Sequence, residues 1–216
     1  MNVLIVAAHA DDETLGCGGA IAKHTQAGDK VTLLILGKSG TSREGEDTSN
    51  ELRECAKKAA EILGINDIIF TDLPDQKFDT IPLVDIIKPV SDAIEKSGAE
   101  IVYTHYENDL NRDHKLAFEA TMIAARPQSN VKKILSYEVP SSTEWVSSEN
   151  VFKPNHFVDI TANLDKKLSA MEQYSGELRE FPNPRSLEYL KILAGYHGAT
   201  VNVKAAEAFI LIRGIK

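Results

Sequence analysis

The sequence predicts an α/β fold, with a single Rossmann-like, doubly wound and mainly parallel sheet flanked by helices. Two observations predict it. Strand-like apolar segments alternate with helix-like segments along the chain, and residues 2–8 form a continuous apolar run, typical of a parallel strand buried on both faces. Because 216 residues can bury one sizeable core and leave little room for a second, we expect residues 1–216 to form one domain.

The apolar run at 2–8 is the first expected strand. Residues 13–26 then predict a helix that Gly28 ends, because glycine readily adopts the left-handed conformation found after helices. Residues 30–36 are again apolar and predict the second strand. The following stretch, 37–50, is rich in glycine, serine and charged residues, so it is expected to be a polar loop.

The middle of the chain repeats this pattern. Residues 50–63 are amphipathic and are followed by Gly64, which predicts a helix and its end. Residues 67–71 predict a short third strand. Residues 81–97 predict a helix that must kink or break at Pro89, because a proline inside a helix removes a hydrogen bond and clashes with the preceding turn.

The remaining segments continue the alternation. They are expected to form strands at 101–104, 133–137, 156–160 and 208–212 and helices at 113–125 and 163–179. The irregular stretch 139–156 is expected to be a long loop of the kind that often covers a site. In a doubly wound sheet the ligand crevice lies beyond the carboxyl ends of the strands, so the loops after residues 8, 36 and 104 are the places to look for a site.

The overall charge limits the partners of the protein. The chain has 24 Lys and Arg against 32 Asp and Glu, a formal net charge of −8, whereas a nucleic-acid surface needs clustered positive side chains. No nucleic-acid partner is therefore expected. The longest apolar runs are strand-sized, so no membrane span is expected, and the absence of a basic leader after Met1 predicts a cytoplasmic protein. The sequence is compatible with a homo-oligomer but does not specify one.

A histidine and three acids follow the first expected strand. His9, Asp11, Asp12 and Glu13 lie within five residues, and carboxylates so close together repel one another unless a cation neutralises them. A second interpretation is that Asp11 or Asp12 only caps the helix that begins near Glu13. Capping accounts for one carboxylate and leaves His9 unexplained, so we favour a metal site.

A second polar cluster follows the strand expected at 101–104. Residues 105–114 contain two of the six histidines of the chain and three acidic residues. If strands one and four are neighbours, this loop and the first one face the same crevice. A hydrolytic zinc site takes three protein ligands and leaves one position for water. His9, Asp12 and His114 would supply such a set, with two imidazoles and one carboxylate.

The two clusters resemble the two signatures of the LmbE/PIG-L-like zinc-dependent de-N-acetylases. The H-P-D-D-E opening of that family is similar to His9-Ala10-Asp11-Asp12-Glu13, and its polar loop ending in D-H or N-H is similar to Asp109-Leu110-Asn111-Arg112-Asp113-His114. The order and spacing fit from Met1 through Tyr137-Glu138, and more weakly through residues 182–186 and 206–209.

This resemblance implies roles for the residues of the clusters. His9, Asp12 and His114 would bind the metal, and Asp11 would be the general base. Zinc lowers the pKa of bound water and polarises an amide carbonyl, and a nearby carboxylate takes the proton of the water. Asp113, next to a ligand histidine, would orient an imidazole. A His/Asp site accepts several divalent ions, so the donor set does not by itself fix the metal.

Two residues depart from the family pattern. Ala10 stands in place of the usual proline, which loosens the turn but removes no functional group. Asn111 stands where many members have a histidine, and asparagine can donate a hydrogen bond to an oxyanion but cannot supply a titrating proton. We therefore expect Asn111 to polarise or position the substrate. His105, His156 and His197 would be substitutes if the fold brought one of them near.

Two arginines are candidate substrate contacts. Arg43 follows the second expected strand, and Arg185 lies in the segment Asn183-Pro184-Arg185-Ser186. A guanidinium group can bind hydroxyls, a phosphate or a carboxylate. An equally good interpretation is that each is a surface arginine paired with a nearby glutamate.

The metal-site pattern together with the family resemblance implies a zinc-dependent hydrolase that removes the N-acetyl group of an N-acetylated sugar or glycoconjugate. The alternative is a zinc amidase that acts on a small non-sugar amide, since its metal site would look the same. A protein that binds metal or sugar without turnover is disfavoured by Asp11. Neither the sugar nor its aglycone follows from the sequence.

Overall fold

A seven-stranded sheet forms the centre of the computed structural model, which describes residues 1–40 and 48–215. The strand order is β3-β2-β1-β4-β5-β7-β6. The strands are β1 (Asn2–Ala7), β2 (Lys30–Lys38), β3 (Asp67–Pro74), β4 (Ile101–Thr104), β5 (Lys133–Tyr137), β6 (His156–Asp159) and β7 (Ala206–Gly214). The first five pair in parallel, and β7 runs antiparallel to both β5 and β6. The predicted α/β fold with a mainly parallel sheet is confirmed.

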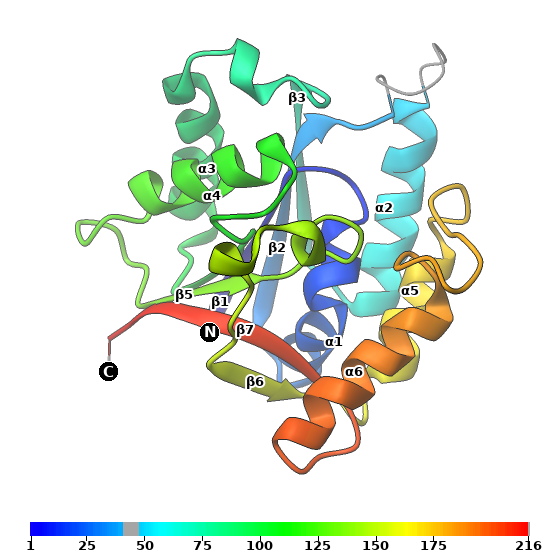
Figure 1. The fold of residues 1–216 in the computed structure, drawn as a ribbon. Coiled ribbons are helices and arrows are strands. Elements are labelled where there is room, and N and C mark those ends of the chain that lie inside the picture. The colour runs from blue at the N-terminus through cyan, green and yellow to red at the C-terminus, as the bar shows by residue number, and fades with distance from the viewer. Residues whose placement is uncertain (41–47, 216) are drawn as a thin grey trace.

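Helices cover both faces of this sheet (Figure 1). One face carries α1 (Asp12–Gln26), α2 (Ser49–Leu63), α5 (Leu164–Glu172) and α6 (Leu187–Thr200), and the other carries α3 (Leu83–Ser97) and α4 (Arg112–Ala124). Short 3-10 helices lie in the connections at η1 (Phe78–Thr80), η2 (Thr143–Trp145) and η3 (Ser148–Asn150). Within the described residues, no helix is both long and apolar enough to cross a membrane.

Strand β1 is buried on both faces, as its continuous apolar sequence predicts. Successive side chains of a strand point to opposite faces, so Val3 and Ile5 pack under α1 while Leu4 and Val6 pack under α3 and α4. The two apolar layers hold β1 rigidly at the centre of the sheet. The loop that follows β1 therefore begins from a fixed position.

Helices α3 and α1 both differ from the helices expected from the sequence. Helix α3 runs through Pro89 without a break, because the packing of its buried face, including Ile86 and Val90, maintains it. The irregularity lies instead in α1, where Cys17 has a non-helical backbone (φ −145°). Of the kink or break expected at Pro89, the break does not occur.

The region after β6 also differs from the expectation. Helix α5 ends at Glu172, short of the expected 179, and the N–H groups of Gln173 and Tyr174 donate to carbonyls three residues back as the chain turns. Helix α6 was not expected at all. Apolar residues such as Ile192 and Tyr196 also occupy its exposed side, so the amphipathic period by which helices are predicted is weak.

The sheet topology directs two polar loops to one place. The strand order reverses between β1 and β4, which pair in parallel with Val3 beside Ile101. Loops that leave neighbouring parallel strands at their carboxyl ends face a common crevice at such a reversal. The loops after Ala7 and Thr104 therefore meet, as expected from the sequence.

Candidate active site

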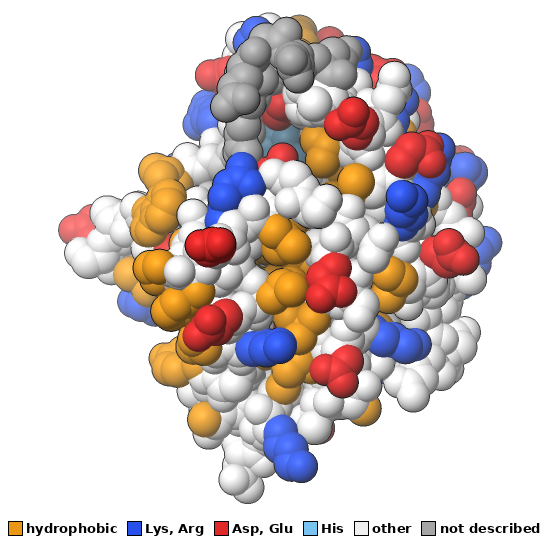
Figure 2. Space-filling model, turned by 90° about the vertical axis from the view of Figure 1, so that its right-hand side faces the viewer, with side chains coloured by type: hydrophobic (Ala, Val, Ile, Leu, Met, Phe, Trp, Pro, Cys, Tyr) orange, Lys and Arg blue, Asp and Glu red, His pale blue; other side chains and the backbone are white. Residues whose placement is uncertain are grey.

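A pocket opens at this carboxyl edge of the sheet. It encloses about 620 Å³ including its open mouth. Seen from the side of α2 and α5, the surface is hollowed, with histidine and acidic side chains visible in the hollow (Figure 2). The described residues that line the pocket are His9, Ala10, Asp11, Ser39, Gly40, Leu52, Asp75, Gln76, Asn111, His114, Ser141, Ser142, Glu177 and Arg185.

Three side chains converge on one wall of this pocket. His9 follows β1, Asp12 is the first residue of α1, and His114 lies in the first turn of α4. One ligand atom from each lies within 4.8 Å of the others. His9 Nδ1 is 3.5 Å from Asp12 Oδ2, and His114 Nε2 is 3.5 Å from Asp12 Oδ1. The fold thus brings together the three residues that the sequence proposed as metal ligands.

A carboxylate fixes the orientation of the His9 ring. Asp113 Oδ2 is 3.0 Å from His9 Nε2, and Asp113 Oδ1 accepts the backbone N–H of Phe78 at 3.0 Å. Asp75 Oδ1 lies 3.4 Å from the same histidine nitrogen. Because Nε2 faces these carboxylates, Nδ1 is the nitrogen of His9 that faces Asp12. Asp113 was expected to orient an imidazole, and it contacts that of His9 rather than that of its sequence neighbour.

A second carboxylate holds the His114 ring in the same way. Asp109 Oδ1 is 3.2 Å from His114 Nδ1, which leaves Nε2 facing Asp12. Asp109 is itself held by the hydroxyls of Ser142, at 3.0 Å, and Thr143, at 2.5 Å. The long connection between β5 and β6 thus buttresses this side of the site.

The acids set the charge of the two rings. Burial opposes protonation of His9, but its hydrogen bonds to Asp113 and Asp12 outweigh burial and raise the pKa to about 10. Burial likewise opposes protonation of His114, but the charges of Asp12 and Asp109 raise its pKa to about 9. The carboxylates therefore favour positive charge at this position, whether on an imidazolium ring or on a bound cation.

Asp11 lies beside these groups with an unusual backbone. Its φ of 101° is in the left-handed region, which is costly for a residue other than glycine and turns the chain sharply into α1. The N–H of Asp11 donates to Glu13 Oε2 at 3.2 Å, and Glu13 Oε1 accepts the hydroxyl of Tyr174 at 2.8 Å. These buried hydrogen bonds fix the backbone of Asp11 so that its side chain lies in the pocket.

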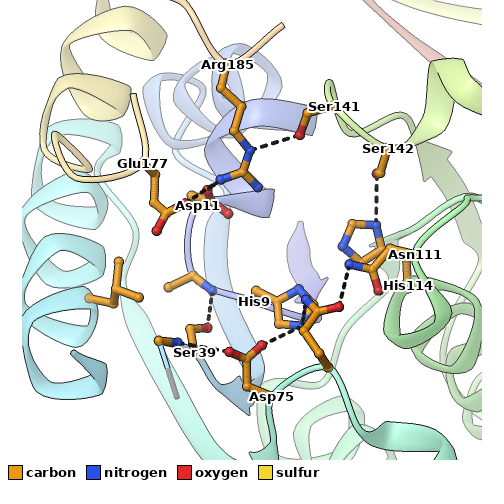
Figure 3. Close-up of a pocket in the computed structure, with 14 residues that line it drawn as sticks. His9, Asp11, Ser39, Asp75, Asn111, His114, Ser141, Ser142, Glu177 and Arg185 are labelled. Carbon is orange, nitrogen blue, oxygen red and sulfur yellow. Dashed lines mark hydrogen bonds and ion pairs between the residues drawn. The ribbon is translucent and has the colours of Figure 1, made fainter. Parts of the chain in front are cut away.

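Arg185 forms the opposite wall and contacts Asp11 (Figure 3). Its Nη1 donates to Asp11 Oδ2 at 2.9 Å and to Glu177 Oε2 at 2.6 Å, and its Nε donates to Ser141 Oγ at 2.9 Å. Burial raises the pKa of Asp11 to about 7 even though the Arg185 charge opposes that shift. Arg185 thus lines the pocket, as expected of a substrate contact, but it is already engaged by two carboxylates.

Asn111 lines the pocket as the N-cap residue of α4. Its Oδ1 accepts the backbone N–H of Asp113 at 2.9 Å, and its Nδ2 faces Gln76 Oε1 at 3.4 Å. The side chain can therefore present N–H to a ligand only beside Gln76. The other predicted substrate contact, Arg43, lies outside the described residues.

The three alternative histidines do not line the pocket. His105 is fully buried beneath it, stacked on His114 with ring centroids 4.0 Å apart, and its Nε2 accepts the N–H of Ala8 at 2.8 Å. Burial and the nearby His114 charge hold the pKa of His105 well below its usual value. His156 lies on β6, and His197 pairs with Glu138 at 2.6 Å. Among the described residues that line the pocket, no histidine therefore takes the place of Asn111.

Several residues in or directly behind the pocket had no assigned role in the sequence interpretation. Asp109 lay within the second cluster, but the sequence did not reveal which carboxylate there would reach a histidine ring. Ser141 and Ser142 come from the stretch 139–156, which was expected to be a loop that covers a site, although neither residue was singled out. Asp75, Gln76 and Glu177 come from connections whose course depends on the fold, and nothing in their local sequence identified them.

Comparison with known proteins identifies relatives of the chain. Residues 4–125 match the family PIG-L, described as GlcNAc-PI de-N-acetylase. The chain is 31% identical over 228 aligned positions to the diacetylchitobiose deacetylase of Thermococcus kodakarensis, covering 99% of this chain and 84% of that protein. It is also 32% identical over 200 positions to the 4-oxalmesaconate hydratase of Pseudomonas putida, covering 82% of this chain and 74% of that protein.

A solved structure has the same fold. The N,N'-diacetylchitobiose deacetylase of Pyrococcus horikoshii superimposes with a TM-score of 0.78 at 21% identity, covering 98% of this chain and 84% of that one. The family match spans more than half of the chain, and the Thermococcus relative covers nearly all of it. The chain therefore belongs to the PIG-L, or LmbE-like, family of de-N-acetylase enzymes.

Proposed function

We propose that the protein is a zinc-dependent hydrolase that removes the acetyl group from an N-acetylated sugar or glycoconjugate. The observation that carries this proposal is the convergence of His9, Asp12 and His114 beside a pocket that Asp11 also lines. The Thermococcus relative, named for the deacetylation of diacetylchitobiose, supports a sugar amide as the substrate rather than a non-sugar amide.

The donor set fits zinc. Two imidazoles and one carboxylate are a common ligand set in hydrolytic zinc sites, which keep another position open. The far nitrogens of His9 and His114 face Asp113 and Asp109, an arrangement that fixes the tautomer and raises the basicity of a ligand imidazole. When bound there, zinc would polarise an amide carbonyl and lower the pKa of a water.

Asp11 is the proposed general base. Its carboxylate lines the pocket, and the hydrogen bond from Arg185 to Oδ2 holds it in one orientation. A carboxylate so placed accepts the proton of the attacking water and returns it to the leaving nitrogen. Asn111 has no proton to give, so its amide N–H would polarise or position the substrate instead.

The remaining predicted residues take supporting roles in this scheme. Asp113 is buried and does not line the pocket, so it acts as a positioning residue through His9. Arg185 orients Asp11 and can contact a substrate bound beside it. Arg43 stays a proposed substrate contact.

The zinc content of the purified chain tests the metal site. We expect about one zinc per chain in the wild type and almost none in His114→Ala, because the loss of one of three ligands leaves too few. The matched control is His156→Ala, which removes a histidine on β6 away from the pocket and should retain zinc. A wild-type chain that holds no zinc after loading and removal of excess metal would contradict the metal site.

Acetate release tests the reaction. The zinc-loaded wild type should release acetate from diacetylchitobiose or N-acetylglucosamine, and His114→Ala should not. An N-acetylated amino acid serves as the non-sugar amide. Acetate release from that compound alone would favour the amidase alternative, and release from none of the three would contradict a deacetylase of small N-acetylated compounds.

A further inference from the structure

We propose that the pocket binds neutral or amine-bearing N-acetylated sugars in preference to phosphorylated or carboxylated ones. Glu177 contributes to this preference because its carboxylate pairs with Arg185. The proposal rests on the proposed function and adds the charge class of the substrate to it. It is carried by the charges around the pocket, by the contacts of Arg185 and by the polar groups that remain for a ligand.

The charged groups around the pocket are mostly acidic. Three carboxylates line it and three more lie at or directly behind the histidine cluster: Asp11, Asp75 and Glu177, and Asp12, Asp109 and Asp113. Among the described lining residues, Arg185 is the one Lys or Arg side chain. A divalent cation held by the cluster would offset two of the six carboxylates, so acidic charge would still be in excess.

Arg185, the one arginine among the described lining residues, is already paired with two acids. Nη1 of Arg185 is shared between Asp11, at 2.9 Å, and Glu177, at 2.6 Å, and its side chain is only 17% exposed. A phosphate or carboxylate that approached this guanidinium would lie close to both acids. Juxtaposed like charges in a partly buried site disfavour binding strongly.

The uncharged polar groups suit a different kind of ligand. Ser39, Ser141, Ser142 and Asn111 line the pocket and can exchange hydrogen bonds with hydroxyl groups. Carboxylates such as Asp75 accept hydrogen bonds from hydroxyls and pair with an ammonium group. The lining is therefore complementary to a hydroxylated sugar, with or without a free amine.

Glu177 is the acid through which this selection is tested, because a ratio of kcat/KM between two sugars cancels any common effect that Glu177 has on Asp11 through Arg185. It reaches the pocket from the turn after α5, and its carboxylate pairs with Arg185 on the side away from the histidine cluster. Asp11 is the proposed base, and Asp75 lies 3.4 Å from His9, so changes at either would also disturb the reaction centre.

The experiment compares sugars that share the same amide and differ by one phosphate. The kcat/KM for acetate release is measured with the zinc-loaded enzyme on N-acetylglucosamine, N-acetylglucosamine 6-phosphate and N-acetylglucosamine 1-phosphate. The wild type should prefer the neutral sugar by at least about tenfold over both phosphates. Glu177→Gln should narrow this preference about three- to tenfold, mainly through a lower KM for the phosphates, because it removes one of the two acids at Arg185.

Glu172→Gln is the matched control, because Glu172 is exposed on α5, does not line the pocket and carries the same charge. It should leave the preference unchanged. Acetate release with no preference in the wild type, or with a preference that Glu177→Gln leaves unchanged, would overturn this inference alone. If none of these sugars nor diacetylchitobiose released acetate, the proposed function would be overturned and this inference with it.

Discussion

Two clusters of buried charge contact helix α1, and they are built differently. At the start of the helix, Asp12 faces His9 and His114 beside the pocket. Further along, where the helix breaks at Cys17, Glu207 of β7 accepts the backbone N–H groups of Gly19, at 2.9 Å, and Ala20, at 2.7 Å. Glu207 also pairs with Lys167 of α5 at 2.6 Å.

The Lys167–Glu207 cluster is balanced. One cation meets one anion, both side chains are at most 5% exposed, and Lys167 Nζ also donates to the carbonyl of Leu15 at 2.8 Å. Glu207 accepts two N–H groups at the break in the helix, and the pair ties α1, α5 and β7 together. Both charged groups have their partners within the cluster, so no ligand is needed to neutralise them.

The cluster at the start of α1 is unbalanced. Its carboxylates outnumber its cations, and one ligand atom from each of His9, Asp12 and His114 converges on a single position. Buried charge alone therefore does not identify a functional site. An excess of one sign together with convergent donor atoms does, because a cation or a substrate must complete it.

The largest effect on catalysis is expected for Asp11→Asn. The variant keeps the size of the side chain and one oxygen for Arg185, but it cannot accept a proton. We expect kcat to fall about 100- to 10,000-fold, as for the loss of a general base, while the zinc content stays that of the wild type. Acetate release and metal analysis on the same preparation measure both.

Asp79→Asn is the control for this variant, because Asp79 is exposed and does not line the pocket. It should retain wild-type kcat. An Asp11→Asn enzyme with nearly full kcat would exclude Asp11 as the base, and one that had lost its zinc would assign Asp11 to metal binding instead.

Disrupting the Lys167–Glu207 cluster should lower the free energy of unfolding and leave the activity unchanged. Lys167→Met keeps the aliphatic bulk but leaves Glu207 buried without its cation, which costs about 3–5 kcal/mol. Urea unfolding should report this loss. The zinc content and kcat/KM of the folded fraction should be unchanged, and Lys166→Met, on the exposed neighbouring residue, should leave stability almost unaltered.

A second substitution distinguishes the pair from simple packing. Adding Glu207→Gln to Lys167→Met should recover part of the lost stability, because it removes the uncompensated charge. If the double variant were less stable than Lys167→Met by the full cost of Glu207→Gln alone, the two side chains would not be coupled. A loss of zinc in Lys167→Met would show that the two clusters on α1 are not separate.

The parts of the site that could be predicted are those fixed by strand ends. His9 follows β1 within two residues, and the loop that carries His114 follows β4, so the order of a doubly wound sheet was enough to bring them together. The contact between Asp11 and Arg185 spans 174 residues and depends on where α5 ends and α6 begins. The amphipathic period of α6 is weak, and α5 ends early, so no sequence pattern predicted that contact.

The smallest effect is expected for Asp109, the carboxylate behind the His114 ring, which the sequence did not separate from its neighbours. Asp109→Asn should weaken zinc binding about 10- to 100-fold, because Asp109 orients the His114 ring and raises its basicity. Competition with a chelator measures this affinity, and Asp165→Asn, on the exposed side of α5, is the control. Asp109 also accepts hydrogen bonds from Ser142 and Thr143, so unfolding of the zinc-free protein must be measured as well. Weaker zinc binding with unchanged zinc-free stability would assign Asp109 to the unbalanced cluster, whereas an equal loss of zinc-free stability would make it an anchor of the loop.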